Sequence, residues 1–267
     1  MKWTIKKIAA WKTQTDTQQD APKEPLATVT AYDAITGRIA DAAGAALVLV
    51  GDSLGDTALG FDSTLPVTME MMLHHTAATR RGVRDAALVA DMPFMSYQAS
   101  QSEAIANAGK FLQLAGADAV KLEGGRIRAP LIKALTDNGI PVMAHIGLMP
   151  QSFKQSGYAV KGRDEAEMAQ IRDDLLAVAE AGAFCVVLEC VNPALAAELT
   201  RLSPIPTIGI GSGAACDGQV LVISDLLGLT DKTPPKFVKR FANLFPAAVA
   251  AVADYAAEVR ARKYPEN

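Results

Sequence analysis

Residues 116–148, GADAVKLEGGRIRAPLIKALTDNGIPVMAHIGL, contain two short apolar runs separated by a longer segment. The runs Asp118–Leu122 and Ile140–His145 have the length and composition of buried strands. The segment between them has the apolar spacing of a helix. A strand, a helix and a second strand in this order form a unit whose two strands pair in parallel. The stretch therefore predicts a parallel α/β sheet.

The same alternation extends in both directions, from Leu26 toward the C-terminus. Further strands are predicted at Ala27–Ala31, Ala46–Gly51, Ala86–Ala90, Ala183–Leu188 and Pro206–Ile210, with a weaker one at Val220–Ser224. Roughly eight strand–helix repeats in about 250 residues fit a single (β/α)₈ barrel better than a doubly wound sheet. We expect one barrel domain over residues 1–267, with residues 1–25 as an N-terminal arm and a closing helix at Phe245–Val259.

Composition disfavours several other classes of protein. Half of the 267 residues are hydrophobic, the net charge is −3, and the three cysteines lack metal-type pairs. The charge gives no basic field for nucleic acid, and no apolar run reaches the roughly 18 residues of a membrane span. The odd cysteine count argues against a disulfide framework or a structural zinc site. Because no segment resembles a secretion signal, we expect a cytoplasmic protein without nucleic-acid or membrane partners.

Polar side chains stand where the predicted strands end, which is where a barrel places its active site. In strand order they are Asp33, Asp52 with Ser53, Asp91, Lys121 with Glu123, His145, and Glu189. Each acid taken alone also fits a purely structural role, in which its side-chain oxygen initiates a turn. Taken together, barrel closure would gather them at one end, where clustered negative charge requires a cation or protons.

Oxygen ligands without a paired histidine set favour a hard cation such as Mg²⁺ over zinc. Asp52, Asp91 and Glu123 lie on neighbouring predicted strands, so one ion is within reach of all three, directly or through water. Glu189, two strands further on, is then free to act as a base. Lys121 shares a strand face with Glu123, which leaves a purely structural ion pair as an alternative.

Several weaker features have two interpretations. His145 either binds substrate or is a satisfied polar residue near the core. The turn Gly209–Gly213 fits the dinucleotide fingerprint only loosely, because the residues after it do not open a helix. A tight turn is favoured there over a nicotinamide-dependent reductase. Cys190 follows Glu189, but nothing in the sequence activates it as a nucleophile.

Longer motifs surround these positions. They are TAYD (30–33), VGDSLG (50–55), DSTLPVT (62–68), ADMPFMSY (90–97), AGADAVKLEGG (115–125), HIGLMPQS (145–152), VLEC (187–190), PTIGIG (206–211) and CDGQVLV (216–222). In combination they resemble the ketopantoate hydroxymethyltransferase (3-methyl-2-oxobutanoate hydroxymethyltransferase) family, from about Leu26 to the C-terminal helix.

The resemblance implies a barrel of the phosphoenolpyruvate/pyruvate-binding type. It implies one Mg²⁺ per subunit at Asp52, Asp91 and Glu123, the keto acid at Asp52, Ser53, Asp91 and Lys121, and Glu189 as proton acceptor. It also implies 5,10-methylenetetrahydrofolate as one-carbon donor, a place at the first step of pantothenate biosynthesis, and a homo-oligomer, often a decamer. The alternatives are a Mg²⁺-dependent 2-oxo acid lyase or aldolase of the same superfamily without folate, and a catalytically silent barrel.

The chain departs from the family pattern at Asp56, Ala144, Met149 and Ser212, where an apolar residue, glycine, threonine and alanine are expected. None of these is a predicted metal or base position. Asp56 and Met149 bear on folate handling or on a mobile loop.

Overall fold

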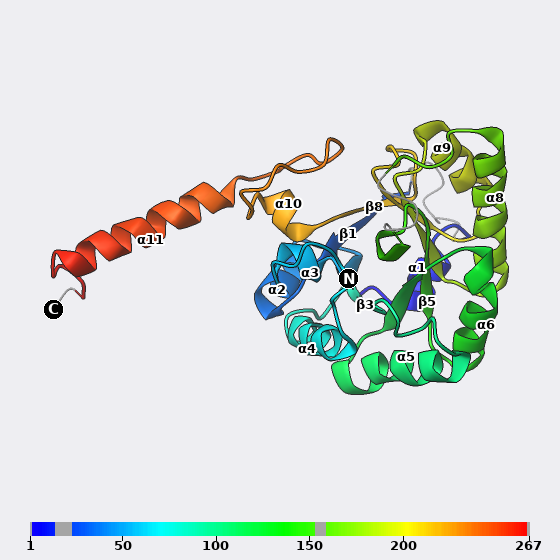
Figure 1. The fold of residues 1–267 in the computed structure, drawn as a ribbon, viewed down its shortest axis with the longest axis horizontal. Helices are drawn as coiled ribbons and strands as arrows, with labels where there is room; N and C mark the ends of the chain where they lie inside the picture. The colour runs from blue at the N-terminus through cyan, green and yellow to red at the C-terminus, as the bar shows by residue number, and fades with distance from the viewer. Residues whose placement is uncertain (1, 14–22, 153–158, 266–267) are drawn as a thin grey trace. The chain divides into compact units, whose positions relative to one another are not determined.

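The structure is a computed structural model and describes residues 2–13, 23–152 and 159–265 (Figure 1). Residues 14–22 of the predicted N-terminal arm lie outside the described part. The chain divides into two compact units, Met1–Val220 and Leu221–Asn267. That all 267 residues form one domain stays a prediction.

The first unit is built on a closed barrel of parallel strands that follow one another in sequence order. The strands are β1 (Leu26–Thr30), β2 (Leu47–Val50), β3 (Ala87–Asp91), β4 (Ala119–Glu123), β5 (Val142–Gly147), β6 (Cys185–Glu189), β7 (Thr207–Ile210) and β8 (Gly218–Leu221). The (β/α)₈ architecture is therefore confirmed.

The eighth strand is the one whose predicted position was wrong. It ends at Leu221, and Ile223–Leu227 forms the short helix α10, so Ile223 and Ser224 are helical. β8 begins at Gly218, opposite Ile208 of β7. A Cβ atom at Gly218 would lie 2.4 Å from the carbonyl oxygen of Leu26, so glycine allows the close approach of β8 to β1. Glycine weakens the apolar strand pattern, which explains the missed boundary.

Helices cover the outside of the barrel (Figure 1). They are α2 (Ala34–Ala42), α4 (Met69–Arg80), α5 (Gln101–Ala115), α6 (Ala129–Asp137), α8 (Glu165–Glu180) and α9 (Pro193–Leu202). Shorter helical pieces are α3 (Leu54–Thr57), η1 (Arg126–Arg128) and η2 (Pro150–Ser152). Ser100 caps α5, because its side chain accepts a hydrogen bond from the Glu103 N–H. That helix stops at Gly116, whose φ of 71° is the left-handed conformation glycine favours.

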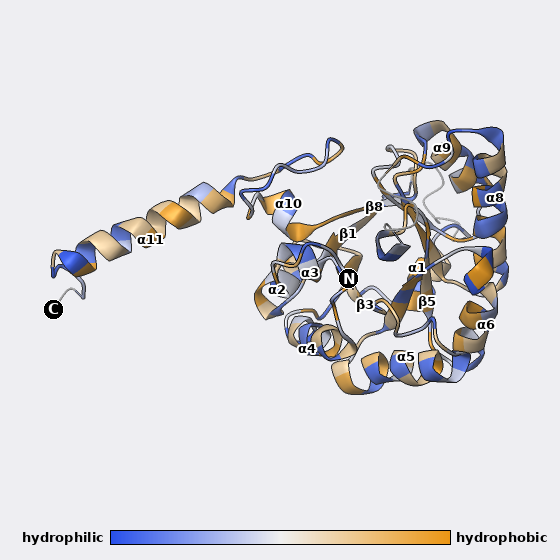
Figure 2. Ribbon diagram, viewed as in Figure 1, coloured by the Kyte–Doolittle hydropathy of each residue, from blue (hydrophilic) through white to orange (hydrophobic). Residues whose placement is uncertain are grey.

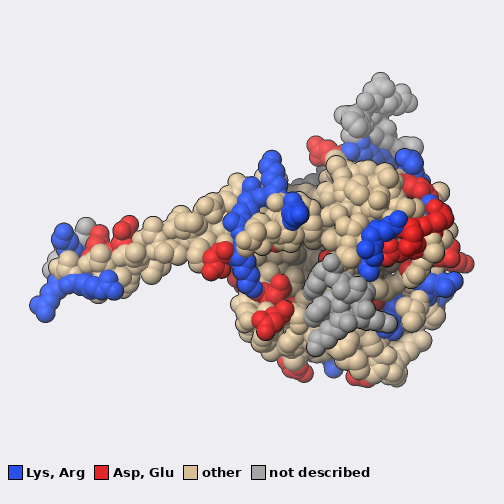
Figure 3. Space-filling model, turned by 45° about the horizontal axis from the view of Figure 1, so that its top comes forward, with Lys and Arg blue, Asp and Glu red and all other residues tan. Residues whose placement is uncertain are grey.

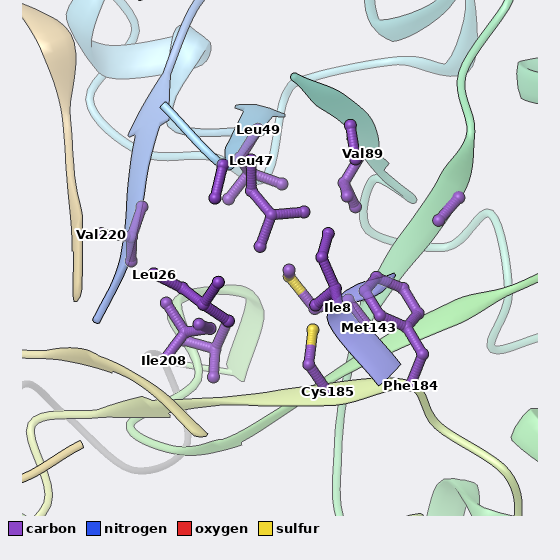
Figure 4. Packing of buried hydrophobic residues seen from close by; sticks show 14 residues of the cluster. Ile8, Leu26, Leu47, Leu49, Val89, Met143, Phe184, Cys185, Ile208 and Val220 are labelled. Atoms are coloured by element: carbon purple, nitrogen blue, oxygen red, sulfur yellow. The ribbon is translucent and has the colours of Figure 1, made fainter. Parts of the chain in front are cut away.

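The hydrophobic core lies toward the amino-terminal ends of the strands. It contains the first residues of several strands, such as Leu26, Leu47 and Cys185 (Figure 4). Ile8 from the N-terminal helix α1 (Ile5–Ala9) points into this cluster and is fully buried. This end of the barrel is therefore filled with apolar side chains, which leaves the carboxyl ends of the strands for polar ones.

The second unit contains α10 and the helix α11 (Leu244–Arg260), which has 17 residues. None of the residues of α11 is buried, although Figure 2 colours most of it in the hydrophobic range. Among the helices of the described residues, none is long and apolar enough to cross a membrane. Figure 3 shows basic side chains (lysine and arginine) and acidic side chains on the same face of the barrel. This mixture agrees with the small net charge of the chain.

Candidate active site

The ends of β3 and β4 place a buried ion pair at the carboxyl-terminal end of the barrel. Asp91 is opposite Lys121 in the parallel register. The Nζ atom of Lys121 lies 2.9 Å from Oδ1 of Asp91, and both side chains are buried. The structure thus pairs the predicted lysine with an acid of the neighbouring strand rather than making Lys121–Glu123 an isolated structural pair.

Asp52 follows β2 and approaches the same ion pair. Its backbone N–H donates a 3.0 Å hydrogen bond to Oδ2 of Asp91. The next residue, Ser53, has its Oγ atom 2.9 Å from the hydroxyl of Tyr32. A Cβ atom at Gly51 would lie 2.8 Å from that Oγ, so the glycine makes room for the serine. Asp52, Ser53 and Asp91 therefore line one polar end of the barrel.

His145 on β5 lies between two predicted carboxylates. Its Nε2 atom is 3.2 Å from Oε2 of Glu189, and its Nδ1 atom is 3.6 Å from Oε1 of Glu123. The Nζ atom of Lys121 is 3.4 Å from the same Nδ1. Burial and the nearby Lys121 lower the pKa of His145, although Glu189 acts in the opposite direction. The imidazole is therefore neutral at pH 7.

Gln151 is a site residue that the sequence did not single out. It lies in η2, after β5, and its Nε2 atom donates a 2.9 Å hydrogen bond to Oδ2 of Asp52. Its backbone N–H donates to Oε2 of Glu123 at 3.0 Å. The HIGLMPQS motif contains this glutamine, but a position in a loop has no periodicity that would reveal which way it faces.

Acidic groups outnumber positive ones in this buried cluster, which contains Asp52, Asp91, Glu123 and Lys121. Burial, followed by the charge of Asp91, raises the pKa of Asp52 to about 7. Burial also raises the pKa of Glu123 well above its usual range. Burial alone would lower the pKa of Lys121, but the surrounding carboxylates outweigh it and raise that pKa. The lysine stays charged, while the acids require further positive charge to ionise fully.

A divalent cation fits this electrostatic imbalance, and the candidate donors are all oxygens. Among the described residues, no three acidic, histidine or cysteine side chains are gathered closely enough to enclose an ion by themselves. An ion held by Asp52, Asp91 and Glu123 would therefore need water or substrate oxygens as additional ligands. Mg²⁺ commonly binds in this way, with one or two carboxylates and several other oxygens.

The raised pKa of Asp52 predicts that cation binding strengthens with pH. Between 3.8 and about 7 the folded, cation-free protein holds a proton on Asp52 that the unfolded chain has lost. Its free energy of unfolding therefore falls as the pH rises through this window, and a cation must displace that proton. Because the pKa of Glu123, the other buried acid proposed as a ligand, is raised as well, we expect Mg²⁺ affinity to drop by at least about tenfold per pH unit below pH 7. Calorimetric titration with Mg²⁺ at pH 6, 7 and 8 measures this, and a flat profile would contradict it.

Other candidates from the sequence take structural roles. The carboxylate of Asp33 is exposed and caps α2 by accepting hydrogen bonds from the N–H groups of Ile35 and Thr36. Cys190 is half-buried, and burial raises the pKa of its thiol to about 11, so it is not an activated nucleophile. In the glycine-rich turn, the buried Ser212 donates to the carbonyl of Leu188 and accepts from the N–H of Val191. This turn therefore ties β6 to β7.

Comparisons with known proteins identify relatives by sequence and by fold. The family model described as ketopantoate hydroxymethyltransferase matches residues 10–267. The chain is 54% identical over 245 residues to the 3-methyl-2-oxobutanoate hydroxymethyltransferase of Carboxydothermus hydrogenoformans, covering 91% of this chain and 89% of that protein. It is 47% identical to the protein of the same name from Synechocystis, covering 99% and 98%.

Solved structures of low sequence identity share the fold. One is 2,3-dimethylmalate lyase, a member of the PEP mutase/isocitrate lyase superfamily, with a TM-score of 0.59, 14% identity, and coverage of 100% of this chain and 87% of that one. Another is phosphoenolpyruvate phosphomutase from Streptomyces platensis, with a TM-score of 0.59, 17% identity, and coverage of 91% and 85%. These neighbours confirm the predicted barrel fold. On the strength of its family match and its close relatives, the chain belongs to the ketopantoate hydroxymethyltransferase family.

Proposed function

We propose that this protein is a 3-methyl-2-oxobutanoate hydroxymethyltransferase. It transfers one carbon from 5,10-methylenetetrahydrofolate to 3-methyl-2-oxobutanoate, and water supplies the hydroxyl group. The products are 2-dehydropantoate and tetrahydrofolate, at the first step of pantothenate biosynthesis. The observation that carries the proposal is the buried Asp52–Asp91–Lys121 group beside Glu189, in a chain whose relatives bear this enzyme's name.

The buried polar group is suited to hold a small 2-oxo acid. Lys121 stays charged and offsets the negative charge of the substrate carboxylate, with Asp52 and Asp91 beside it. Ser53, next to Asp52 in the chain, is proposed to bind the same keto acid. When bound at Asp52, Asp91 and Glu123, a Mg²⁺ ion would polarise the keto group and make the C3 proton more acidic. Exclusion of water from this buried end strengthens each of these electrostatic interactions.

Glu189 is the base in this proposal. Its side chain is 17% exposed, so it borders the buried group while remaining open to a ligand. Glu189 takes the C3 proton, and the C3–H electron pair becomes that of an enolate. The enolate carbon then bonds to the methylene carbon of the folate as one of the two C–N bonds of that carbon breaks, and the released nitrogen takes up the proton that Glu189 removed. Water then displaces the second folate nitrogen from the same carbon. One proton of the water goes to that nitrogen, and the remaining hydroxyl completes the hydroxymethyl group as tetrahydrofolate leaves. Neutral His145, with its Nε2 atom 3.2 Å from Oε2 of Glu189, keeps the carboxylate oriented.

A Mg²⁺-dependent 2-oxo acid lyase or aldolase without folate is the rival from the same superfamily. Proton NMR of 3-methyl-2-oxobutanoate with the enzyme and Mg²⁺ in D₂O separates the two, with and without methylenetetrahydrofolate. We expect loss of the C3 proton signal in both samples and a hydroxymethyl product only with folate. Exchange of the C3 proton without the hydroxymethyl product would rule out folate as a partner. If folded protein gave neither exchange nor product, the proposed substrate would be overturned.

We also propose that the protein assembles as a homo-oligomer. The apolar residues Phe245, Val249, Val252 and Val259 lie on one face of α11, and each is at least 38% exposed. Within its own unit, Leu221–Asn267, this stripe has no cover, and an apolar stripe on a helix normally packs against another surface. In this proposal, that surface belongs to a second copy of the chain. Whether the assembly is a decamer, and whether the protein is cytoplasmic, stay predictions.

The stripe on α11 gives a prediction about assembly. Val252→Glu places a charge in the centre of the apolar face and should shift the protein to smaller species. The matched control Ala250→Glu adds the same charge on the opposite side of the helix, where we expect no shift. Size-exclusion chromatography with light scattering measures both variants. Equal masses for wild type and Val252→Glu would count against α11 as the assembly surface.

A further inference from the structure

Gln151 contacts two of the proposed cation ligands, and these ligands come from different strands. The side chain reaches Asp52 after β2, with Nε2 at 2.9 Å from Oδ2. The backbone N–H reaches Glu123 at the end of β4, at 3.0 Å from Oε2. Gln151 itself follows β5 and is 5% exposed. One buried residue from a third segment thus links two carboxylates that no strand pairing connects directly.

Three hydrogen bonds of 2.9 Å or shorter fix the orientation of the Gln151 amide. Its Nε2 atom donates both to Asp52 and to the carbonyl oxygen of Met92, each at 2.9 Å. Its Oε1 atom accepts a 2.6 Å hydrogen bond from the hydroxyl of Tyr97. A flipped amide would turn its oxygen toward two acceptors and its nitrogen toward a donor. The NH₂ group is therefore directed at Asp52.

Tyr97 is tied to the same group of residues. Its hydroxyl oxygen accepts a 3.2 Å hydrogen bond from the backbone N–H of Glu123, and its proton goes to Gln151. The side chain is 3% exposed, and burial raises the pKa of its hydroxyl well above the usual range, so the group remains a donor. A closed ring of hydrogen bonds thus joins Gln151, Tyr97 and Glu123. The side-chain amide of Gln151 extends this ring to Asp52.

We infer that Gln151, aimed by Tyr97, is a positioning residue that holds Asp52 and Glu123 in the arrangement that binds the divalent cation. This inference rests on the proposed function, because that function requires the cation. Without the Gln151 amide, the Asp52 carboxylate loses its side-chain donor and is free to rotate. Outer partners that orient a metal-binding side chain typically affect metal affinity by about 10- to 100-fold.

Mn²⁺ titration followed by electron paramagnetic resonance tests the inference, because bound Mn²⁺ loses the signal of the free ion. The measurement uses the full chain with 3-methyl-2-oxobutanoate present. Gln151→Met keeps the length of the side chain and the backbone N–H to Glu123 but removes the amide. We expect Mn²⁺ binding about 10- to 100-fold weaker in this variant. Tyr97→Phe removes a single hydroxyl, which aims the amide and also accepts the Glu123 N–H, and we expect roughly fivefold weaker binding.

The double variant distinguishes positioning from general structural support. If Tyr97 acts through Gln151, the variant with both changes should bind Mn²⁺ no more weakly than Gln151→Met alone. Gln98→Met is the matched control, because the Gln98 amide nitrogen approaches Oε1 of Gln151 only at 3.4 Å and the side chain is half-buried. We expect wild-type affinity from it. Melting curves in EDTA check that each variant is folded.

Each failure has a separate meaning. Wild-type protein that binds neither Mn²⁺ nor keto acid would overturn the proposed function. Wild-type binding together with unchanged affinity in Gln151→Met or Tyr97→Phe would overturn the inference alone, as would additive losses in the double variant. Should Gln151→Met fail to fold, Tyr97→Phe still decides, because it removes a single oxygen atom.

Discussion

Glu189→Gln should lower the turnover number by about 10²- to 10⁴-fold while leaving cation and keto-acid binding intact. The amide has the shape of the carboxylate but is not a base, so proton removal from C3 is the step that fails. Glu189 lies at the end of β6, outside the Asp52–Asp91–Lys121 group, so the substitution leaves those contacts in place. Steady-state product formation and C3 proton exchange in D₂O should fall together.

A matched control is available at another strand exit. Asp33→Asn makes the same acid-to-amide change after β1, but Asp33 is exposed and caps α2. Because asparagine is also a good N-cap, stability and turnover should both stay near wild type. Near-normal turnover in Glu189→Gln would remove that residue from the role of base.

Most of the barrel was predictable because buried parallel strands leave a strong mark in the sequence. Strands such as β3 and β6 are apolar runs without alternation, since both of their faces are covered. The position of β8 was missed because its first residue is a glycine selected by the close approach of Leu26, a contact between distant parts of the chain. No local pattern reveals such a contact.

The candidate site was predictable to a similar degree and for a topological reason. Barrel closure brings the carboxyl ends of the strands together, so acids at those ends lie near one another whatever the other side chains are. Asp52, Asp91 and Glu189 lie at that end of the barrel in the structure, as their positions after predicted strands lead us to expect. Asp33 has the same sequence position relative to its strand, but its carboxylate accepts hydrogen bonds from the first N–H groups of the helix that follows. Gln151 was missed because its role depends on how a loop folds back over two other strands.

Lys121→Met should destabilise the protein and abolish keto-acid binding. Lys121 is buried against Asp91, and removal of one partner of a buried ion pair typically costs about 3–5 kcal/mol. The cost should depend on pH. Lys121 lowers the pKa of both Asp52 and Glu123, so these values rise further in the variant. The folded variant therefore keeps protons on these two acids up to a higher pH than the wild type does, whereas the unfolded chain has already lost them. Its free energy of unfolding then falls further with rising pH than that of the wild type.

Urea unfolding in EDTA at pH 5.5 and pH 8 measures this dependence, with the larger loss expected at pH 8. Lys133→Met serves as the control, because Lys133 pairs with Asp137 on the surface of α6 with a side chain 59% exposed. An exposed pair of this kind should change stability by less than about 1 kcal/mol, with little effect of pH. If Lys121→Met lost equal stability at both pH values, the charge of Lys121 would not lower the pKa values of Asp52 and Glu123 in the wild-type protein. Lys121 would then be a packing residue, and the buried acids would need another source of positive charge to ionise.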